Sequence, residues 1–321
     1  MLVSKQNVVL AVIVLGLAAA DWMTMPTAIQ EREVQRLFPA MKASLARRLV
    51  VTDPERKEPL VITQAEAEEL ERAPDAWWRL PALHGWPAFD TPMRSMLRWV
   101  DNLSTLDLLA SDADSHGDYG LLDGQGIRIQ IYDGQGEVLA DFYQGLMAPG
   151  GRATYVRAVG EDEVWRAPGV RGRLRADPRI WMETTWLPLT RAEVVVNTIE
   201  LSGAGFAEGL RLERSEASVA LWRRPDGELV PSSAVRALFD ELDALVVDEI
   251  SANAVDAQLL AAPRLAVRLE RSTGEAWTAY FGEAGSAGKT PATRGAQDWL
   301  VTFPESAVAR VVESAQRLRG K

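Results

Sequence analysis

The chain of 321 residues contains no cysteine and only two histidines, His84 and His116. The absence of cysteine excludes disulfides, thiolate catalysis and cysteine-based zinc sites. Any histidine-dependent chemistry must therefore use one of the two imidazoles. Basic residues are also in the minority, since 45 acidic side chains outnumber 35 basic ones and give a net charge of -10. This balance argues against a phosphate-binding surface and therefore against nucleic acid as a partner.

The N-terminus has a hydrophobic run that is short for a membrane span. Residues Val8–Ala20 are all apolar or small, whereas a bilayer core needs about 20 residues. An anchor over residues 1–25 places Asp21 near the outer interface and Trp22 in the interfacial belt. Positive charge precedes the run and acidic residues follow it. This asymmetry predicts a single-pass anchor with a cytoplasmic N-terminus and an exported body.

The same residues also fit a secretory signal peptide. The length of the run suits a signal-peptide core, and Ala18–Ala20 fits the small-residue cleavage pattern. A buried N-terminal helix in a cytosolic protein is a third interpretation. The residues of this segment alone leave these alternatives open.

The second half of the chain repeats the first. The strand, turn and strand that begin at Gly126 align without a gap on those that begin at Arg264, at an offset of 138 residues. Turn residues Gly136-Glu137 fall on Gly274-Glu275, and Phe142 falls on Tyr280. Two upstream blocks follow at offsets of 142 and 144: Met93, Met96, Leu97, Val100 and Leu103 on Val235, Leu238, Phe239, Leu242 and Leu245, and Trp78-Arg79-Leu80-Pro81 on Trp222-Arg223-Arg224-Pro225. Blocks in the same order with slowly drifting offsets indicate a duplicated unit.

Each unit mixes strands and helices. Ile127, Ile129 and Ile131 alternate with polar residues, which is the period of a strand with one buried face. The apolar positions from Met93 to Leu103 share one helical face. We therefore predict an α+β protein of two tandem repeated units of antiparallel sheet packed on helices, preceded by one transmembrane helix. The expected ranges are an anchor or signal peptide over 1–25, a first unit over 26–190 and a second over 191–321.

Two motifs imitate chemical sites but have the wrong spacing or context. Gly285–Thr290 resembles a phosphate-binding loop, but the first glycine is one residue too far away and the loop joins two predicted strands. Asp112–Asp123 approaches the calcium-loop spacing, but His116 occupies position five and a short aspartate occupies position twelve. We interpret this stretch as a polar connector. No Gly-x-Ser-x-Gly element is present. We therefore predict no catalytic, cofactor or metal site, and hence no enzyme.

Tryptophan is abundant, with 11 residues. A group of them, Trp77, Trp78, Trp86, Trp181 and Trp186, could line a glycan or peptide groove or pack between the units. Packing is the favoured interpretation, since tryptophan dominates both cores and interfaces. The candidate interaction residues are Trp22 in the membrane segment and Trp181 and Trp186 at the junction.

A set of short elements recurs in a known family. They are Leu37-Phe38-Pro39, Trp78-Arg79-Leu80-Pro81, Trp86-Pro87-Ala88, Tyr119-Gly120-Leu121, Gly145, Gly150-Gly151, Tyr155-Val156-Arg157, Glu163-Val164-Trp165 and the Trp181 segment. Through these elements the sequence from Trp78 to Leu201 resembles an uncharacterised bacterial family, domain-of-unknown-function family 4340. The resemblance implies an N-terminal segment in the bacterial inner membrane, which favours a retained anchor with the body in the periplasm. It also implies genes that often lie beside ABC transporter components of the gliding-associated type, and it implies no catalytic residue.

These observations favour a non-catalytic, membrane-anchored periplasmic accessory subunit of an ABC-transporter-type envelope complex. Its expected partner is a membrane protein, either a transporter permease or a gliding-type auxiliary subunit. The alternative is a periplasmic binding module for a glycan, lipid or peptide that uses a Trp-rich groove. No cofactor is expected in either case.

The membrane segment gives a first testable prediction. A reporter that is active only in the periplasm should be active when fused after Lys321, because the charge asymmetry around Val8–Ala20 directs the body outward. Activity of a cytoplasm-only reporter at the same site would contradict this topology. N-terminal sequencing separates the alternatives, since a mature chain starting at Asp21 is a cleaved signal peptide.

Overall fold

The computed structural model describes residues 35–66, 77–169, 174–187, 196–204, 206–214, 221–251, 255–295 and 298–319. The predicted anchor, with Trp22, lies outside these ranges. Within them, no helix is both long and apolar enough to cross a membrane.

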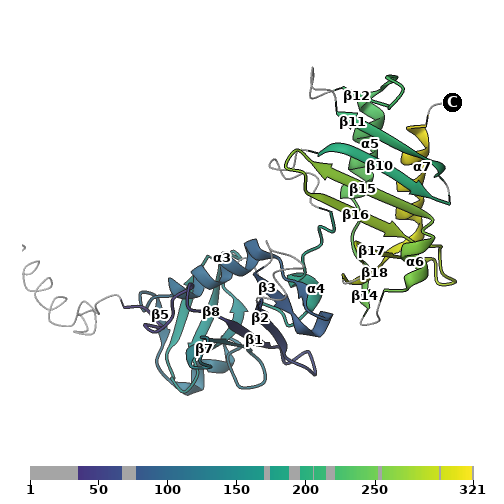
Figure 1. Ribbon diagram of the computed structural model, residues 1–321. Helices are drawn as coiled ribbons and strands as arrows, with labels where there is room; N and C mark the ends of the chain where they lie inside the picture. The colour runs from purple at the N-terminus through teal and green to yellow at the C-terminus, as the bar shows by residue number, and fades with distance from the viewer. Residues whose placement is uncertain are drawn as a thin grey trace, which may run out of the picture.

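The described residues form two nine-stranded antiparallel sheets (Figure 1). The first has the strand order β4-β3-β2-β1-β6-β7-β8-β9-β5, and the second has the order β13-β12-β11-β10-β15-β16-β17-β18-β14. The first sheet consists of β1 (Arg48–Thr52), β2 (Leu60–Gln64), β3 (Trp78–Leu80), β4 (Trp86–Pro87), β5 (Leu108–Ala110), β6 (Ile127–Tyr132), β7 (Val138–Met147), β8 (Ala153–Ala158) and β9 (Val164–Pro168). The second consists of β10 (Val196–Gly203), β11 (Phe206–Arg214), β12 (Trp222–Arg223), β13 (Leu229–Val230), β14 (Glu249–Ser251), β15 (Leu265–Arg271), β16 (Ala276–Phe281), β17 (Lys289–Thr293) and β18 (Leu300–Pro304).

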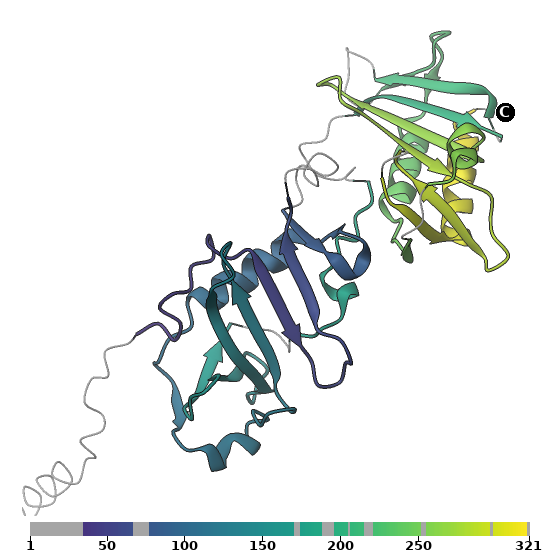
Figure 2. The ribbon, with the colours of Figure 1, turned by 60° about the horizontal axis from the view of Figure 1, so that its bottom comes forward.

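The two sheets have the same topology. Each strand of the first has a counterpart nine strands later in the chain, at the same place in the sheet. The helices are α3 (Asp90–Asp101), α4 (Pro178–Trp181), α5 (Ser232–Asp243), α6 (Ala257–Ala261) and α7 (Glu305–Arg317). Figure 2 shows α3 on one face of the first sheet, and α5 with α7 on one face of the second. The predicted α+β class and the internal duplication are confirmed for the described residues.

The strand pairing extends the duplication beyond the blocks visible in the sequence. Leu49 lies opposite Ile131 in the first sheet, and Ile199 lies opposite Leu269 in the second. Because Ile131 and Leu269 are equivalent, Leu49 and Ile199 are equivalent too, at an offset of 150 residues. The two first strands share little beyond apolar alternation, which explains why the sequence alone did not align them.

The offset falls steadily along the chain. Thr154 lies opposite Ala167 in the first sheet, and Thr290 lies opposite Phe303 in the second. This pairing sets an offset of 136 residues for the last two strands. The second unit thus keeps all nine strands, but the connections between them are shorter than in the first unit.

One predicted equivalence is wrong. The gapless alignment placed Phe142 on Tyr280, but Phe142 lies opposite Ile129, whereas Ala279 lies opposite Val267. An irregularity at the start of β7 inserts one extra residue into the hairpin of β6 and β7, compared with the equivalent hairpin of β15 and β16. Since neighbouring residues of a strand face opposite sides of the sheet, the true counterpart of the buried Phe142 is the buried Ala279.

The helices cover the sheets with the apolar faces that the sequence predicted. All five predicted positions of the first helix are buried: Met93, Met96, Leu97, Val100 and Leu103. In the second unit four of the five are buried, whereas Phe239 is half-buried with its ring 6.0 Å from that of Trp222. Helix α7 packs beside α5 and completes this cover.

Truncation of these faces should lower stability. Leu97→Ala and Leu238→Ala should each lower the free energy of unfolding by about 2–5 kcal/mol, because each removes a buried side chain and leaves a cavity. The matched control is Arg236→Ala on the exposed face of α5, which should change it by less than about 0.5 kcal/mol. Urea unfolding followed by circular dichroism measures all three. A buried-site variant as stable as the control would contradict the packing of its helix.

Candidate interaction surface

The junction segment, residues 178–187, connects the two units. Its first half pairs with the first unit, since the Phe89 N–H donates to the Trp181 carbonyl at 2.6 Å. The Trp86 indole N–H donates to the Glu183 carbonyl at 2.8 Å. These bonds hold the start of the junction segment against β4.

The second half of the junction segment belongs to the second unit. The ring of Trp186 meets those of Phe281 and Phe303 edge-on, with centroids 5.4 and 4.9 Å away. Thr185 and Val246 form an isolated antiparallel bridge. The core of the second unit therefore includes a tryptophan supplied from before its first strand.

The two units also touch directly through Trp299, which precedes β18. Its indole N–H donates to the His84 carbonyl at 2.9 Å. Its ring lies edge-on to that of Trp86, with centroids 5.2 Å apart. His84 has a left-handed backbone with φ 56° at the end of a short 3₁₀ turn.

The junction accounts for most of the tryptophans considered for a groove. Trp181 and Trp186 are 4% and 2% exposed. Their predicted contact with a partner stays a prediction, and it would require exposure of side chains that are buried here. Trp22 lies outside the described residues. Only Trp77 among the groove candidates has a largely exposed side chain, at 47%.

A cluster of exposed leucines lies at the edge of the first sheet. Leu106, Leu108 and Leu109, here called the leucine edge, are 67%, 37% and 42% exposed. Strand β5 ends the sheet, so within the described chain its outer side has no neighbouring strand. This surface could not be predicted from the sequence, because Leu-Asp-Leu-Leu-Ala at residues 106–110 is equally typical of a buried strand.

The chain enters the body beside this leucine edge. The Thr105 N–H donates to the Gln35 carbonyl at 3.0 Å, and the Leu37 N–H donates to the Leu103 carbonyl at 2.8 Å. Residues 35–37 thus run alongside the residues that lead directly into β5. The first described residue after the predicted anchor is therefore tied next to the leucine edge.

The second unit has a polar surface at the equivalent edge. Leu108 pairs with Trp165 as Ile250 pairs with Val301, so β5 and β14 occupy the same position. At β14, however, the Lys289 ammonium lies 2.8 Å from Asp248 and 2.6 Å from Glu249. Hydrogen bonds to Asp248 and Glu249 raise the pKa of Lys289 and keep it charged.

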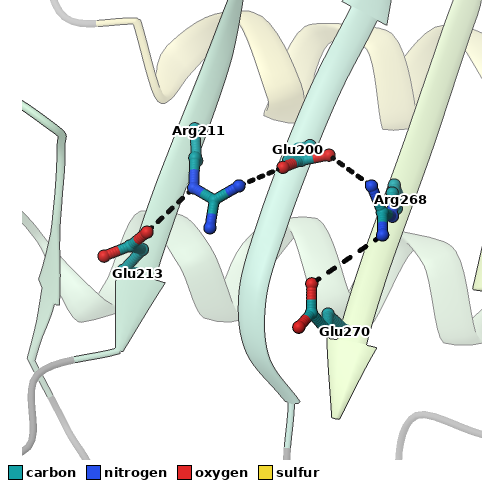
Figure 3. Close-up of polar contacts among 5 residues, drawn as sticks. All are labelled: Glu200, Arg211, Glu213, Arg268 and Glu270. Carbon is teal, nitrogen blue, oxygen red and sulfur yellow. Dashed lines mark hydrogen bonds and ion pairs between the residues drawn. The ribbon is translucent and has the colours of Figure 1, made fainter. Parts of the chain in front are cut away.

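The exposed face of the second sheet carries a row of paired charges (Figure 3). Glu200 on β10 accepts from Arg211 on β11 and from Arg268 on β15. Arg211 also contacts Glu213 at 2.8 Å, and Arg268 lies 3.9 Å from Glu270. Hydrogen bonding to Glu213, with the charge of Glu200, raises the pKa of Arg211. These charges pair with one another, which is typical of a solvated sheet face rather than of a ligand site.

The residues of the motifs that resemble a phosphate-binding loop and a calcium loop make contacts within the fold. Gly285–Thr290 joins β16 to β17, and Lys289 is held by the two carboxylates at β14. Asp112 accepts from the Ser115 N–H at 3.0 Å and caps a 3₁₀ turn. Within the described ranges, no group of three or more potential ligand residues could hold a metal ion.

Two further residues of the calcium-like stretch, His116 and Asp123, also make contacts within the fold. His116 is buried, with Nε2 2.9 Å from the Asp162 carbonyl oxygen. Asp123 pairs with Arg157 at 3.0 Å, and this guanidinium lies over the Tyr143 ring. The stretch therefore fastens the β5–β6 connection to the sheet.

The described residues define a class: a duplicated α+β protein with two nine-stranded antiparallel sheets of the same strand order. Residues 78–286 match the family model described as a domain of unknown function, DUF4340. The chain belongs to this family. The match runs from β3 to the turn after β16 and so includes parts of both units. No curated protein and no solved structure matches the chain.

The junction gives a testable prediction. Trp299→Phe should loosen the contact between the units, because it keeps an aromatic ring but removes the N–H that donates to the His84 carbonyl. We expect an increase in the radius of gyration by small-angle X-ray scattering and a loss of about 1 kcal/mol of stability. Trp277→Phe is the matched control, since its ring stacks on Arg271 within the second unit. Identical scattering from both variants would show that the contact does not hold the units together.

Proposed function

We propose that the protein is a non-catalytic, membrane-anchored accessory subunit of an ABC-transporter-type envelope complex, with its body in the periplasm. Its partner in this proposal is a membrane protein, either the transporter permease or a gliding-type auxiliary subunit. The observation that carries the proposal is the leucine edge beside Gln35, where the chain arrives from the predicted anchor.

The chemistry of the leucine edge suits an interface. Burial of a leucine side chain contributes about 1.5–3 kcal/mol relative to full exposure. Within the described residues no strand pairs with the outer side of β5, and an open sheet edge favours the addition of a strand from another protein. A partner that covers this edge can therefore gain both apolar burial and backbone hydrogen bonds.

The position of the leucine edge relative to the predicted anchor supports a membrane partner. Fourteen residues lie between Ala20 and Gln35, and even fully extended the chain from one to the other spans only about 50 Å. The leucine edge, tied beside Gln35, would stay within this distance of the bilayer. A partner's periplasmic surface lies within the same range.

The divergence between the two units supports contact at one edge only. The Asp248–Glu249–Lys289 ion pairs give β14 a polar surface, whereas β5 presents leucines at the equivalent position. Two copies of one scaffold would differ in this way if only the first met a partner. The structural engagement of His116 and Lys289 supports contact rather than chemistry as the role of the body.

The double variant Leu106→Asp/Leu108→Asp tests this proposal. In the full-length chain purified from solubilised membranes, we expect it to lower co-purification of an ABC transporter permease or auxiliary subunit, identified by mass spectrometry, by at least about tenfold. Both side chains are exposed, so folding should be retained. Leu229→Asp is the control, because Leu229 lies on the edge strand β13 with 53% exposure.

Two results would overturn the proposal. One is recovery of the same partner at equal yield with the β5 double variant and with Leu229→Asp. The other is loss of biological activity on replacing His84, His116 or Lys289 while the partner stays bound, which would indicate an enzyme.

A further inference from the structure

A basic pocket lies between α3 and the segment that precedes β1. The residues that line it include Arg47, Arg94, Arg98, Asp90 and the half-exposed Trp77. The cavity has a volume of about 280 Å³, close to the lower limit of about 300 Å³ for small-molecule pockets. It therefore has room for one ring-sized group.

Positive charge in this pocket exceeds what the described residues neutralise. Arg94 pairs with Asp90 one turn earlier on α3. Arg47 uses one nitrogen to donate to the Ser44 and Ala46 carbonyls, at 2.8 and 2.9 Å. Those bonds fix the guanidinium in place without cancelling its charge.

Arg98 is the group that the described chain leaves without an acidic partner. It lies one turn after Arg94 on α3, so two like charges are neighbours on one face of the helix, an arrangement that is destabilising by itself. An anion bound to Arg98 would offset this repulsion. This local excess stands out in a chain whose net charge is -10.

The second unit does not repeat this arrangement. At the offset of α3 and α5, Arg94 corresponds to Arg236, but Arg98 corresponds to Asp240. At the offset of β3 and β12, Trp77 corresponds to Leu221. The scaffold thus folds without the second arginine and without the exposed indole, so the requirements of the fold do not explain them.

We propose that this pocket binds one residue of an anionic sugar, with the ring on the face of Trp77 and the acidic group on Arg98 and Arg47. A half-exposed indole offers a flat apolar face for the C–H groups of a sugar ring. Guanidinium groups bind carboxylates and phosphates through paired hydrogen bonds. An uncharged sugar would leave the arginines unpaired, and a simple inorganic anion would leave Trp77 uncovered.

The test is isothermal titration calorimetry on the detergent-solubilised full-length protein with a glucuronic acid disaccharide. Arg98→Gln and Trp77→Ala should each weaken binding by at least about tenfold, since each removes one of the two contacts. Arg236→Gln is the matched control on the second unit and should leave the affinity unchanged. An uncharged glucose disaccharide and inorganic phosphate should each bind at least about tenfold more weakly than the acidic sugar.

Three outcomes would overturn the proposal. The first is equal affinity of Arg98→Gln and Arg236→Gln for the acidic disaccharide. The second is equal affinity of the protein for the acidic and the uncharged disaccharide. The third is tighter binding of a triglutamate peptide than of the sugar, which would make the pocket a site for acidic peptides. Circular dichroism spectra of the variants separate a lost contact from lost folding, and none of these results depends on recovery of a membrane partner.

Discussion

Both units depend on one long-range pairing, of β1 with β6 in the first and of β10 with β15 in the second. In each unit the chain between the paired strands contains four further strands, with α3 in the first unit and α5 and α6 in the second. The pairing therefore closes a long loop and must offset the entropy of that closure. Its register also decides which residues are buried, because a shift by one residue would move Leu49 and Ile131 to the opposite face. Hairpins then extend the sheet on both sides of this pair. The strands at the two edges of the first sheet, β4 and β5, are short.

The sequence predicted the features that local periodicity and turn chemistry determine. Ile127, Ile129 and Ile131 indicated a strand, and the glycines Gly136 and Gly274 marked equivalent turns with positive φ. The hairpins β1–β2 and β10–β11 could not be aligned from the sequence, because their strands share only a pattern of burial. The extra residue in β7 could not be predicted from the sequence either, because it changes the strand pairing but not the composition. The bond from Trp299 to His84 could not be predicted, because its acceptor is a backbone carbonyl far away in the chain.

The duplication separates the requirements of the fold from those of function. Positions that are apolar in both units, such as Leu97 with Phe239 or Ile129 with Val267, maintain the core. Surface positions that differ between the two units are those where a partner or a ligand can bind to one unit and not to the other. The leucine edge and the pocket beside Trp77 both belong to the first unit, the one that follows the predicted anchor. The second unit carries paired charges at its exposed face and at its β14 edge, and so supplies no comparable apolar surface there.

The insertion of Trp186 between Phe281 and Phe303 has a consequence for dividing the protein into fragments. A fragment begun at residue 191, the start of the second unit expected from the repeat, would contain every strand of that unit but not this indole. The two phenylalanine rings would then border an empty volume, and removal of a large aromatic side chain from a core costs about 3–5 kcal/mol. A fragment cut at residue 191 would therefore lose much of the stability of an average domain, although the cut interrupts no strand. The structural border of the second unit therefore precedes its first strand, and a self-sufficient fragment has to begin before Thr185.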